Sequence, residues 1–404
     1  MPSTIGWLDT TAEQQRIARE MVSLFMLSES RDELGIGQIR DVLSNWMFPG
    51  TSVLQTRARY FVLIPWCYEV AERRARRSAK DLEQHVREVQ REMIESMRRD
   101  FPDEDGLIGK QAGRALKGLP RDLFWSGLVA FGIRRTEIDV PPPTTQDEGE
   151  VSELADRQPT AWDPDLPDRP RDFPGFVPHG LEMSGKEAEW LSERMRTGHE
   201  DTYLAHLLEL DPRVLQPTMA PWEVPTTRHF TSVEHARCFS LLMEGASLLY
   251  NLLVAERYAS HPDLNRLDGS ERIQHFEDEL QRWAVQAVAA DLMTWDFDGF
   301  RGHVATINRR ISRSTWSFVE EWLDIVRRLG PSAVTPSAEA RRHVEARERR
   351  KGNKSRLGSN PKMLESWNGD SGSGALLYRW SNISRLVQDI NGGRGTQETS
   401  LADA

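Results

Sequence analysis

The sequence predicts a mainly α protein in which two multi-helical domains are joined by a proline-rich acidic strap. Apolar residues recur at three- and four-residue spacings in several long stretches, as expected for amphipathic helices. Strand-like alternation is sparse, and nothing resembles the strand–helix alternation that builds a parallel sheet. Residues 141–180 contain nine prolines and nine acidic residues against three basic ones, a composition typical of extended chain.

The N-terminal domain, residues 1–140, is expected to contain two clear amphipathic helices. The first follows a capping box at Thr10 and Glu13 and presents apolar residues at helical spacing as far as Phe25. The second covers residues 82–97, where the apolar side chains fall on one face. Between them, the apolar run at residues 60–64 fits either a short strand or a buried helix that ends at Pro65.

The larger domain, residues 181–330, is predicted from three further helices. A capping box at Ser184 and Glu187 opens one of them. A second box, at Thr231 and Glu234, opens a broad apolar helix that extends to about residue 258 and belongs near the centre of the domain. The third helix carries apolar residues at positions 318–329, and the following glycine and proline indicate its end.

The remaining segments are predicted from composition. Trp162, Phe173 and Phe176 can attach the 141–180 strap to a folded surface. Residues 331–375 are rich in Ser, Gly, Asn and Arg, and we expect a basic flexible loop. Apolar residues return at helical spacing in 376–391, which predicts a docked helix. The tail, residues 392–404, is expected to be disordered.

The composition favours a cytoplasmic protein. The net charge is −10 and 38% of the residues are hydrophobic, which is enough to build packed cores. Charges interrupt the apolar stretches before the length of about 20 residues that a membrane span needs. The N-terminus lacks the basic and apolar regions of a secretory signal. Because Cys67 and Cys238 are the only cysteines, neither a disulfide framework nor a cysteine-based zinc site is expected.

Motifs for catalysis are missing from the sequence. It contains no complete phosphate-binding loop, no His-Glu-x-x-His zinc motif and no Gly-x-Ser-x-Gly elbow. His235 beside Glu234 fits a general base oriented by a carboxylate, but an ordinary histidine near a helix start is the favoured interpretation. We therefore expect no metal and no cofactor, and an enzyme is the less favoured alternative.

Local clusters of positive charge on this acidic chain are the strongest functional signal. The largest holds eight cations between residues 341 and 356 against two acidic residues. Its members are Arg341, Arg342, Arg347, Arg349, Arg350, Lys351, Lys354 and Arg356. Phosphate backbones are the commonest target of such a segment, and an acidic partner protein is the second candidate. The alternative is a solvated loop without a ligand.

Three smaller clusters accompany it. Arg73, Arg74, Arg76 and Arg77 follow the 60–64 run and are expected to begin a helix, where a salt-bridged solvent face is the alternative. Residues 309–313 contain a weaker group of three arginines. Arg57 and Arg59 can clamp a phosphate or a partner carboxylate. They fit equally well an internal ion pair, for instance with residue 32, 33 or 41.

The segment around Arg57 and Arg59 also carries a resemblance. Phe48-Pro49-Gly50-Thr51-Ser52, Thr56-Arg57-Ala58-Arg59-Tyr60 and Pro65-Trp66 resemble an uncharacterised bacterial family, a domain of unknown function that covers nearly the whole chain. The resemblance implies a place in anti-phage defence islands, beside DISARM-like helicase genes and phospholipase-D-like nuclease genes. It implies no catalytic residues.

Taken together, these features predict a non-catalytic subunit of a bacterial multi-protein anti-phage defence system. We expect it to bind DNA, a helicase or nuclease partner of the same system, or both. Two alternatives remain open. One is a metal-dependent nuclease or other effector enzyme with a dispersed carboxylate site, and the other is a pure protein scaffold or regulator.

Overall fold

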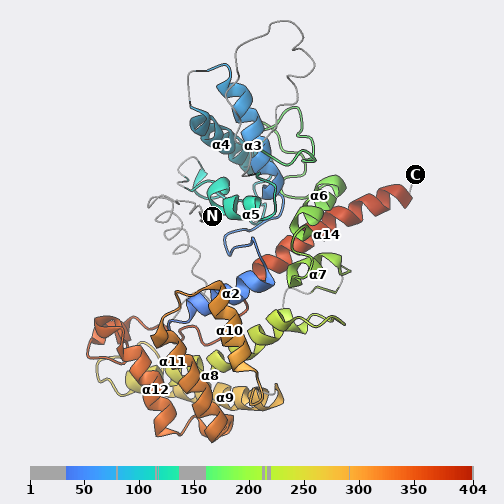
Figure 1. Cartoon of the computed structure of the whole chain (residues 1–404). Helices are drawn as coiled ribbons and strands as arrows, with labels where there is room; N and C mark the ends of the chain where they lie inside the picture. The colour runs from blue at the N-terminus through green and yellow to red at the C-terminus, as the bar shows by residue number, and fades with distance from the viewer. Residues whose placement is uncertain are drawn as a thin grey trace, which may run out of the picture. The chain divides into compact units, whose positions relative to one another are not determined.

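The protein is mainly helical in the computed structural model, and the part of the chain that it describes contains no strand (Figure 1). The described residues are 33–402, apart from 79–80, 114–115, 117, 136–160, 212–213, 216–219 and 291, and the side chains of 396–402 are also left out. The helix expected between Thr10 and Phe25 lies outside this range. The only bridge of β type in the described residues pairs Arg134 with Trp162.

The chain divides into two compact units, each built from separate segments of sequence. In the described range, the first unit comprises residues 47–211, 214–215 and 379–402, and the second comprises residues 33–46 and 220–378. Composition had placed continuous domains at 1–140 and 181–330, whereas residues 181–211 here belong to the first unit. The C-terminal helix also belongs to the first unit, although the residues before it, up to Tyr378, belong to the second.

The first unit is built around two helical pairs. Its helices are α3 (Tyr60–Ala75), α4 (Leu82–Asp100), α5 (Pro120–Ala130), α6 (Gly185–Arg196), α7 (Tyr203–Glu209) and α14 (Trp380–Ala402). Helix α3 packs along α4, and α14 packs along α6 (Figure 1). The predicted capping box is present at the start of α6, where the Ser184 side chain accepts from the Glu187 amide and the Glu187 side chain accepts in return.

The ambiguous apolar run at 60–64 is the first part of a helix, and Pro65 lies inside that helix. The expectation that the run ends at Pro65 is therefore wrong. Pro65 removes one backbone hydrogen bond near the start of α3, while every residue from Tyr60 to Cys67 is buried and favours the continuous helix. As a result Arg73 and Arg74 lie in the last turn of α3 and do not begin a helix.

The described part of the proline-rich segment, residues 161–180, is irregular but attached to the first unit. Trp162 and Phe173 are buried, whereas Phe176 is exposed. The Trp66 indole donates to the Pro167 carbonyl at 2.7 Å, and Trp66 meets Phe173 edge to face. Two of the three aromatic side chains therefore hold this segment in place.

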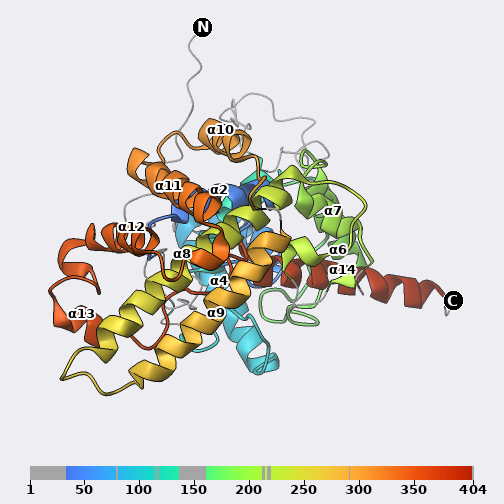
Figure 2. The same ribbon diagram turned by 90° about the horizontal axis from the view of Figure 1, so that it is seen from below.

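The second unit is built around the long helix α8 (Thr231–Ala259). It also contains most of α2 (Gly37–Met47), whose last residue is assigned to the first unit, together with α9 (Gly269–Ala289), α10 (Phe297–Ile307), α11 (Arg313–Leu329), α12 (Ala338–Arg349) and the short α13 (Pro361–Glu365). Helix α9 lies alongside α8 (Figure 2). The Trp283 and Trp322 indoles donate to the α8 carbonyls of Leu241 and Leu242, at 2.7 and 2.9 Å.

Helix α8 combines length with apolar character. Among the described helices it alone is long and apolar enough to cross a membrane by length and composition, and 83% of its most apolar window is buried inside the protein. It ends within one residue of the predicted position, but Thr231 is its first residue and the cap is Phe230. The predicted capping box is therefore not formed there.

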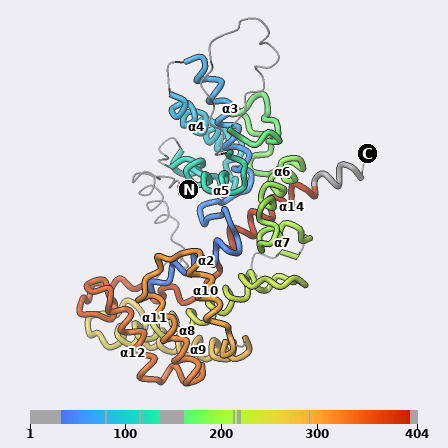
Figure 3. The backbone as a smooth tube through the Cα atoms, viewed as in Figure 1, coloured from blue at the N-terminus to red at the C-terminus, as the bar shows by residue number. Residues whose placement is uncertain are grey.

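The segment 331–375, expected to be a flexible loop, contains helices α12 and α13. Helix α12 lies beside α11 (Figure 3), and Ser337 caps it by accepting from the Ala340 amide at 3.3 Å. The buried Ala340 and Val344 provide the packing that the basic composition concealed. The predicted C-terminal helix is present as α14, whose backbone continues to Ala402, through most of the expected tail.

Candidate polyanion-binding surface

The cations predicted to contact a partner separate into buried structural groups and exposed groups. Arg57 belongs to the buried set, with 5% of its surface exposed. Its Nε donates to the Asp389 carboxylate at 3.0 Å, and its Nη1 donates to Glu104 at 2.6 Å and to the Asp105 carbonyl at 2.8 Å. Burial by itself lowers the pKa of Arg57, but the hydrogen bonds and negative charges of Asp389 and Glu104 have the larger combined effect, and the pKa is raised. This guanidinium holds α14 to the loop after α4.

Arg59 is also committed to internal contacts. It is 3% exposed, and its Nη2 donates to Glu187 at 2.9 Å. Its Nη1 donates to the carbonyls of Pro178 and Gly180 at 2.5 and 2.8 Å. Arg57 and Arg59 therefore form internal ion pairs, the alternative left open above, although their acids differ from those considered there.

The cations at the end of α3 are only partly paired. Arg74 makes a bidentate contact with Glu92 at 2.8 and 2.9 Å. Arg73, Arg76 and Arg77 are exposed. Arg73 and Arg74 lie in the last turn of α3, where positive side chains complement the helix macrodipole, as Arg347 and Arg349 do in α12.

Several cations of the 341–356 segment hold the second unit together. Lys351 pairs with Glu33 at 2.6 Å, and Arg356 pairs with the same carboxylate at 2.7 Å. Burial opposes ionisation of Glu33, but these two partners lower its pKa. Lys351 also pairs with the fully buried Glu348 at 2.5 Å, and Arg341 pairs with Glu256.

Arg347 is fixed by its neighbours as well. Its guanidinium donates to the carbonyls of Leu34 and Gly35 at 2.7 and 3.1 Å and to Ser314 Oγ at 3.0 Å. It also lies over the Phe318 ring, 5.1 Å from the centroid. These contacts connect the end of α12 to the start of α11 and to the turn before α2.

Arg342, Arg349, Arg350 and Lys354 remain exposed in this segment. Arg349 pairs with Glu345 at 2.7 Å on the same helix face. Arg350 donates to Ser314 Oγ, which places the end of α12 at the first turn of α11. The two helices thus run antiparallel, side by side (Figure 1).

This packing brings the weaker arginine cluster next to the largest one. Arg309 and Arg313 are exposed, and no described carboxylate forms an ion pair with either of them. Arg313 is the first residue of α11, next to the Ser314 that contacts Arg350. We call Arg309, Arg313, Arg349, Arg350 and Lys354 the α11–α12 cationic surface. The sequence shows both clusters but contains no signal that joins them.

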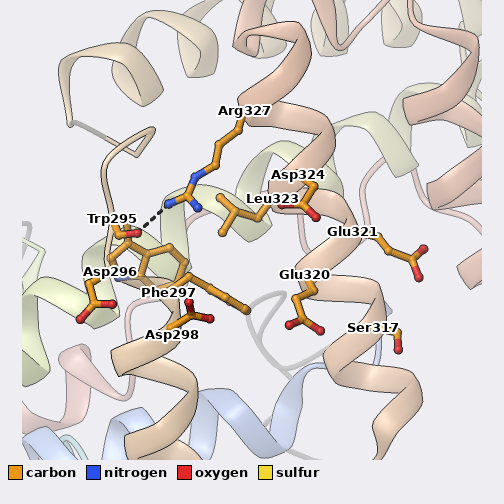
Figure 4. Close-up of a pocket in the computed structure, with 10 residues that line it drawn as sticks. All are labelled: Trp295, Asp296, Phe297, Asp298, Ser317, Glu320, Glu321, Leu323, Asp324 and Arg327. Carbon is orange, nitrogen blue, oxygen red and sulfur yellow. Dashed lines mark hydrogen bonds between the residues drawn. The ribbon is translucent and has the colours of Figure 1, made fainter.

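An acidic cavity lies along α11, where Ser317, Glu320 and Asp324 line it at helical spacing from Arg313 (Figure 4). It has a volume of about 430 Å³ and is lined by Trp295, Asp296, Phe297, Asp298, Ser317, Glu320, Glu321, Leu323, Asp324 and Arg327. Arg327 donates to the Trp295 carbonyl at 2.6 Å. Although five carboxylates line this cavity, no three His, Cys, Asp or Glu side chains in the described residues are placed to hold a metal ion.

His235 lies in an aromatic environment. Its Nδ1 accepts from the Trp295 indole at 2.9 Å, and the Phe300 ring lies 5.5 Å away. Burial lowers its pKa. Glu234 points elsewhere and lies 3.4 Å from His229. The neighbouring carboxylate therefore does not orient His235 as a general base, in agreement with the favoured interpretation.

Comparison with known proteins places the chain in a family. A family model described as a family of unknown function, DUF6361, matches residues 2–393. The chain belongs to this family. No curated protein and no solved structure matches it. The DUF6361 match confirms that the resemblance covers nearly the whole chain, and it assigns no activity and no site residues.

Proposed function

We propose that this DUF6361 protein is a non-catalytic subunit of a bacterial multi-protein anti-phage defence system, and that it binds DNA, a helicase or nuclease partner, or both. The observation that carries the proposal is the α11–α12 cationic surface. It exposes five cations on a chain whose net charge is −10. The resemblance described above supplies the defence context.

Electrostatics favours a polyanion as the ligand of this surface. Each phosphate neutralised by Lys or Arg releases condensed counterions, and the logarithm of the affinity then falls with the logarithm of salt by about 0.9 per contact. The rest of the chain is acidic and repels a polyanion. Binding should therefore be local, with these side chains at its centre.

Arg57, Arg59, Arg347, Lys351 and Arg356 do not contribute to this proposal. Their hydrogen-bonding groups are occupied by carboxylates and backbone carbonyls inside the protein. Releasing any of them for a partner would leave a buried acid or carbonyl without its donor, at a cost of several kcal/mol.

Fluorescence anisotropy with labelled duplex DNA tests the DNA half of the proposal. The intact chain should bind, and its affinity should fall steeply between about 50 and 200 mM salt. Absence of binding at the lowest salt rejects direct DNA binding. Pull-down with helicase and nuclease subunits of the system, after nuclease treatment, tests the partner half, and a complex that survives the treatment depends on protein contacts.

The same purified chain should leave single- and double-stranded DNA and RNA intact in the presence of Mg²⁺ or Mn²⁺. Cleavage under these conditions would replace the proposal by the alternative of a metal-dependent effector enzyme. Variants of the carboxylates in the acidic cavity would then identify whether that cavity is responsible.

A further inference from the structure

We infer that the α11–α12 cationic surface binds the sugar–phosphate backbone of duplex nucleic acid without reading its sequence. This inference rests on the DNA-binding half of the proposed function and names the ligand group, the residues and the mode of binding. The cations carry it, because they are exposed and the contact between Arg350 and Ser314 brings the end of α12 to the start of α11.

Local helix electrostatics disfavours the position of Arg313. Arg313 is the first residue of α11, whose first turn contains no acidic residue. The positive end of the helix macrodipole lies there, so a cation at this position is unfavourable for the helix itself. Residues that break a local rule in this way are expected at functional sites. A phosphate would relieve the repulsion.

Internal acids do not neutralise this surface. In the described residues, Glu345 is the one carboxylate that pairs with a member of it, through Arg349. The nearby Glu348 is fully buried and holds Lys351. Four of the five cations therefore form no ion pair with a carboxylate in the described residues.

The surface is also held in place before any ligand arrives. Arg350 contacts Ser314 Oγ, and Arg347 connects the same hydroxyl to the backbone at Leu34 and Gly35. These bonds fix the end of α12 against the start of α11. A preorganised group of cations loses little conformational freedom when it binds.

The aromatic residues nearby favour a duplex over a single strand. Single-stranded binding uses exposed aromatic rings on which unpaired bases stack. On α11, Trp316 and Phe318 are 7% and 4% exposed, and both face the protein interior. Contacts from long Arg and Lys side chains to phosphates position a duplex but carry no sequence information.

Two triple variants of the intact chain test the inference. The first is Arg309→Ala, Arg313→Ala and Lys354→Ala, which removes three cations of the surface. The matched control is Arg237→Ala, Arg257→Ala and Arg282→Ala, which removes the same charge from exposed positions of the same unit. Both variants should keep the circular dichroism spectrum and a cooperative unfolding transition.

Anisotropy titrations of duplex DNA over a range of salt give the decisive readout. The surface variant should lose at least about tenfold in affinity, and its salt slope should decrease by about two to three, because each lost contact contributes about 0.9. The control should stay within about twofold of the unaltered chain, since it keeps every phosphate contact. Duplexes of unrelated sequence should bind alike, and single-stranded DNA should bind more weakly. A duplex of RNA shows whether the backbone type matters.

The outcomes separate this inference from the proposed function. If the unaltered chain binds duplex DNA and the two variants lose affinity equally, the surface is wrong while DNA binding stands. If single strands bind as tightly as duplexes, the mode of binding is wrong. If no nucleic acid binds, both the inference and the DNA half of the proposed function fail. If, in that case, the surface variant alone also fails to pull down a protein partner, the surface binds an acidic protein and not nucleic acid.

Discussion

Replacing Arg313 by glutamate should stabilise the second unit. Arg313 is exposed at the first position of α11, where Ser312 caps the Thr315 amide at 3.1 Å. A cation there opposes the helix macrodipole and an anion complements it, and each effect amounts to about 0.3–1 kcal/mol at an exposed site. The reversal should therefore add about 1 kcal/mol to the free energy of unfolding. For a unit of this size, the unfolding midpoint should rise by about 2–4 °C.

Scanning calorimetry at low and high salt measures this effect. The gain should shrink at about 1 M salt, where the screening length falls to about 3 Å. The control is Arg257→Glu, which makes the same charge change in the last turn of α8 and should destabilise, because an anion there meets the negative end of the dipole. A lower midpoint for Arg313→Glu, or shifts of the same sign in both variants, would refute the reasoning.

The same Arg313→Glu variant should bind duplex DNA more weakly than the unaltered chain. Opposite effects on stability and on binding are the signature of a residue retained for a ligand and not for the fold. A structural role would move both quantities in the same direction. Comparing the two measurements therefore tests the role of Arg313 independently of the triple variant.

Three further predictions concern the interior. Arg59→Ala should lower the free energy of unfolding by about 3–5 kcal/mol in denaturant titrations, because Glu187 is left buried without its partner; a loss below about 1 kcal/mol contradicts this. Gly245→Ala should cost about 1–3 kcal/mol and change the near-ultraviolet circular dichroism, since a Cβ at this position would overlap the buried Trp283 ring; an unchanged spectrum and stability would show that the helices can separate freely. Burial raises the pKa of Glu244 to about 7, so the unaltered chain should lose stability as the pH rises from 4.5 through 7, where only the unfolded carboxyl is already ionised. The Glu244→Gln variant should not show this loss. It should be more stable than the unaltered chain at about pH 8 but not at about pH 4. Equal effects on stability at both pH values would exclude a raised pKa of Glu244.

Much of the fold follows from local patterns. The spacing of apolar residues locates α4 and α11, the capping box locates the start of α6, and Gly330 followed by Pro331 marks the end of α11. These signals depend on residues within one or two helical turns of each other. The run at 60–64 was ambiguous because a fully buried helix and a buried strand have the same uniform apolar sequence.

The candidate surface was predictable only in part. The sequence reveals the 341–356 cations and the weaker group at 309–313, but it does not show which of them are neutralised. Arg57 finds Asp389 more than 300 residues away, and Lys351 finds Glu33 at a similar separation. Such pairings depend on how distant helices pack.

The sequence by itself therefore determined that the protein is helical, where several of its helices begin and end, and that its positive charge is clustered. Tertiary structure alone decided that Arg57 and Arg59 are internal, that the presumed loop contains α12, and that Arg350 lies against the first turn of α11. Helix formation is governed by contacts three or four residues apart, which a sequence displays directly. The availability of a charge depends instead on which distant acid shares its surroundings, and only the folded chain brings the two together.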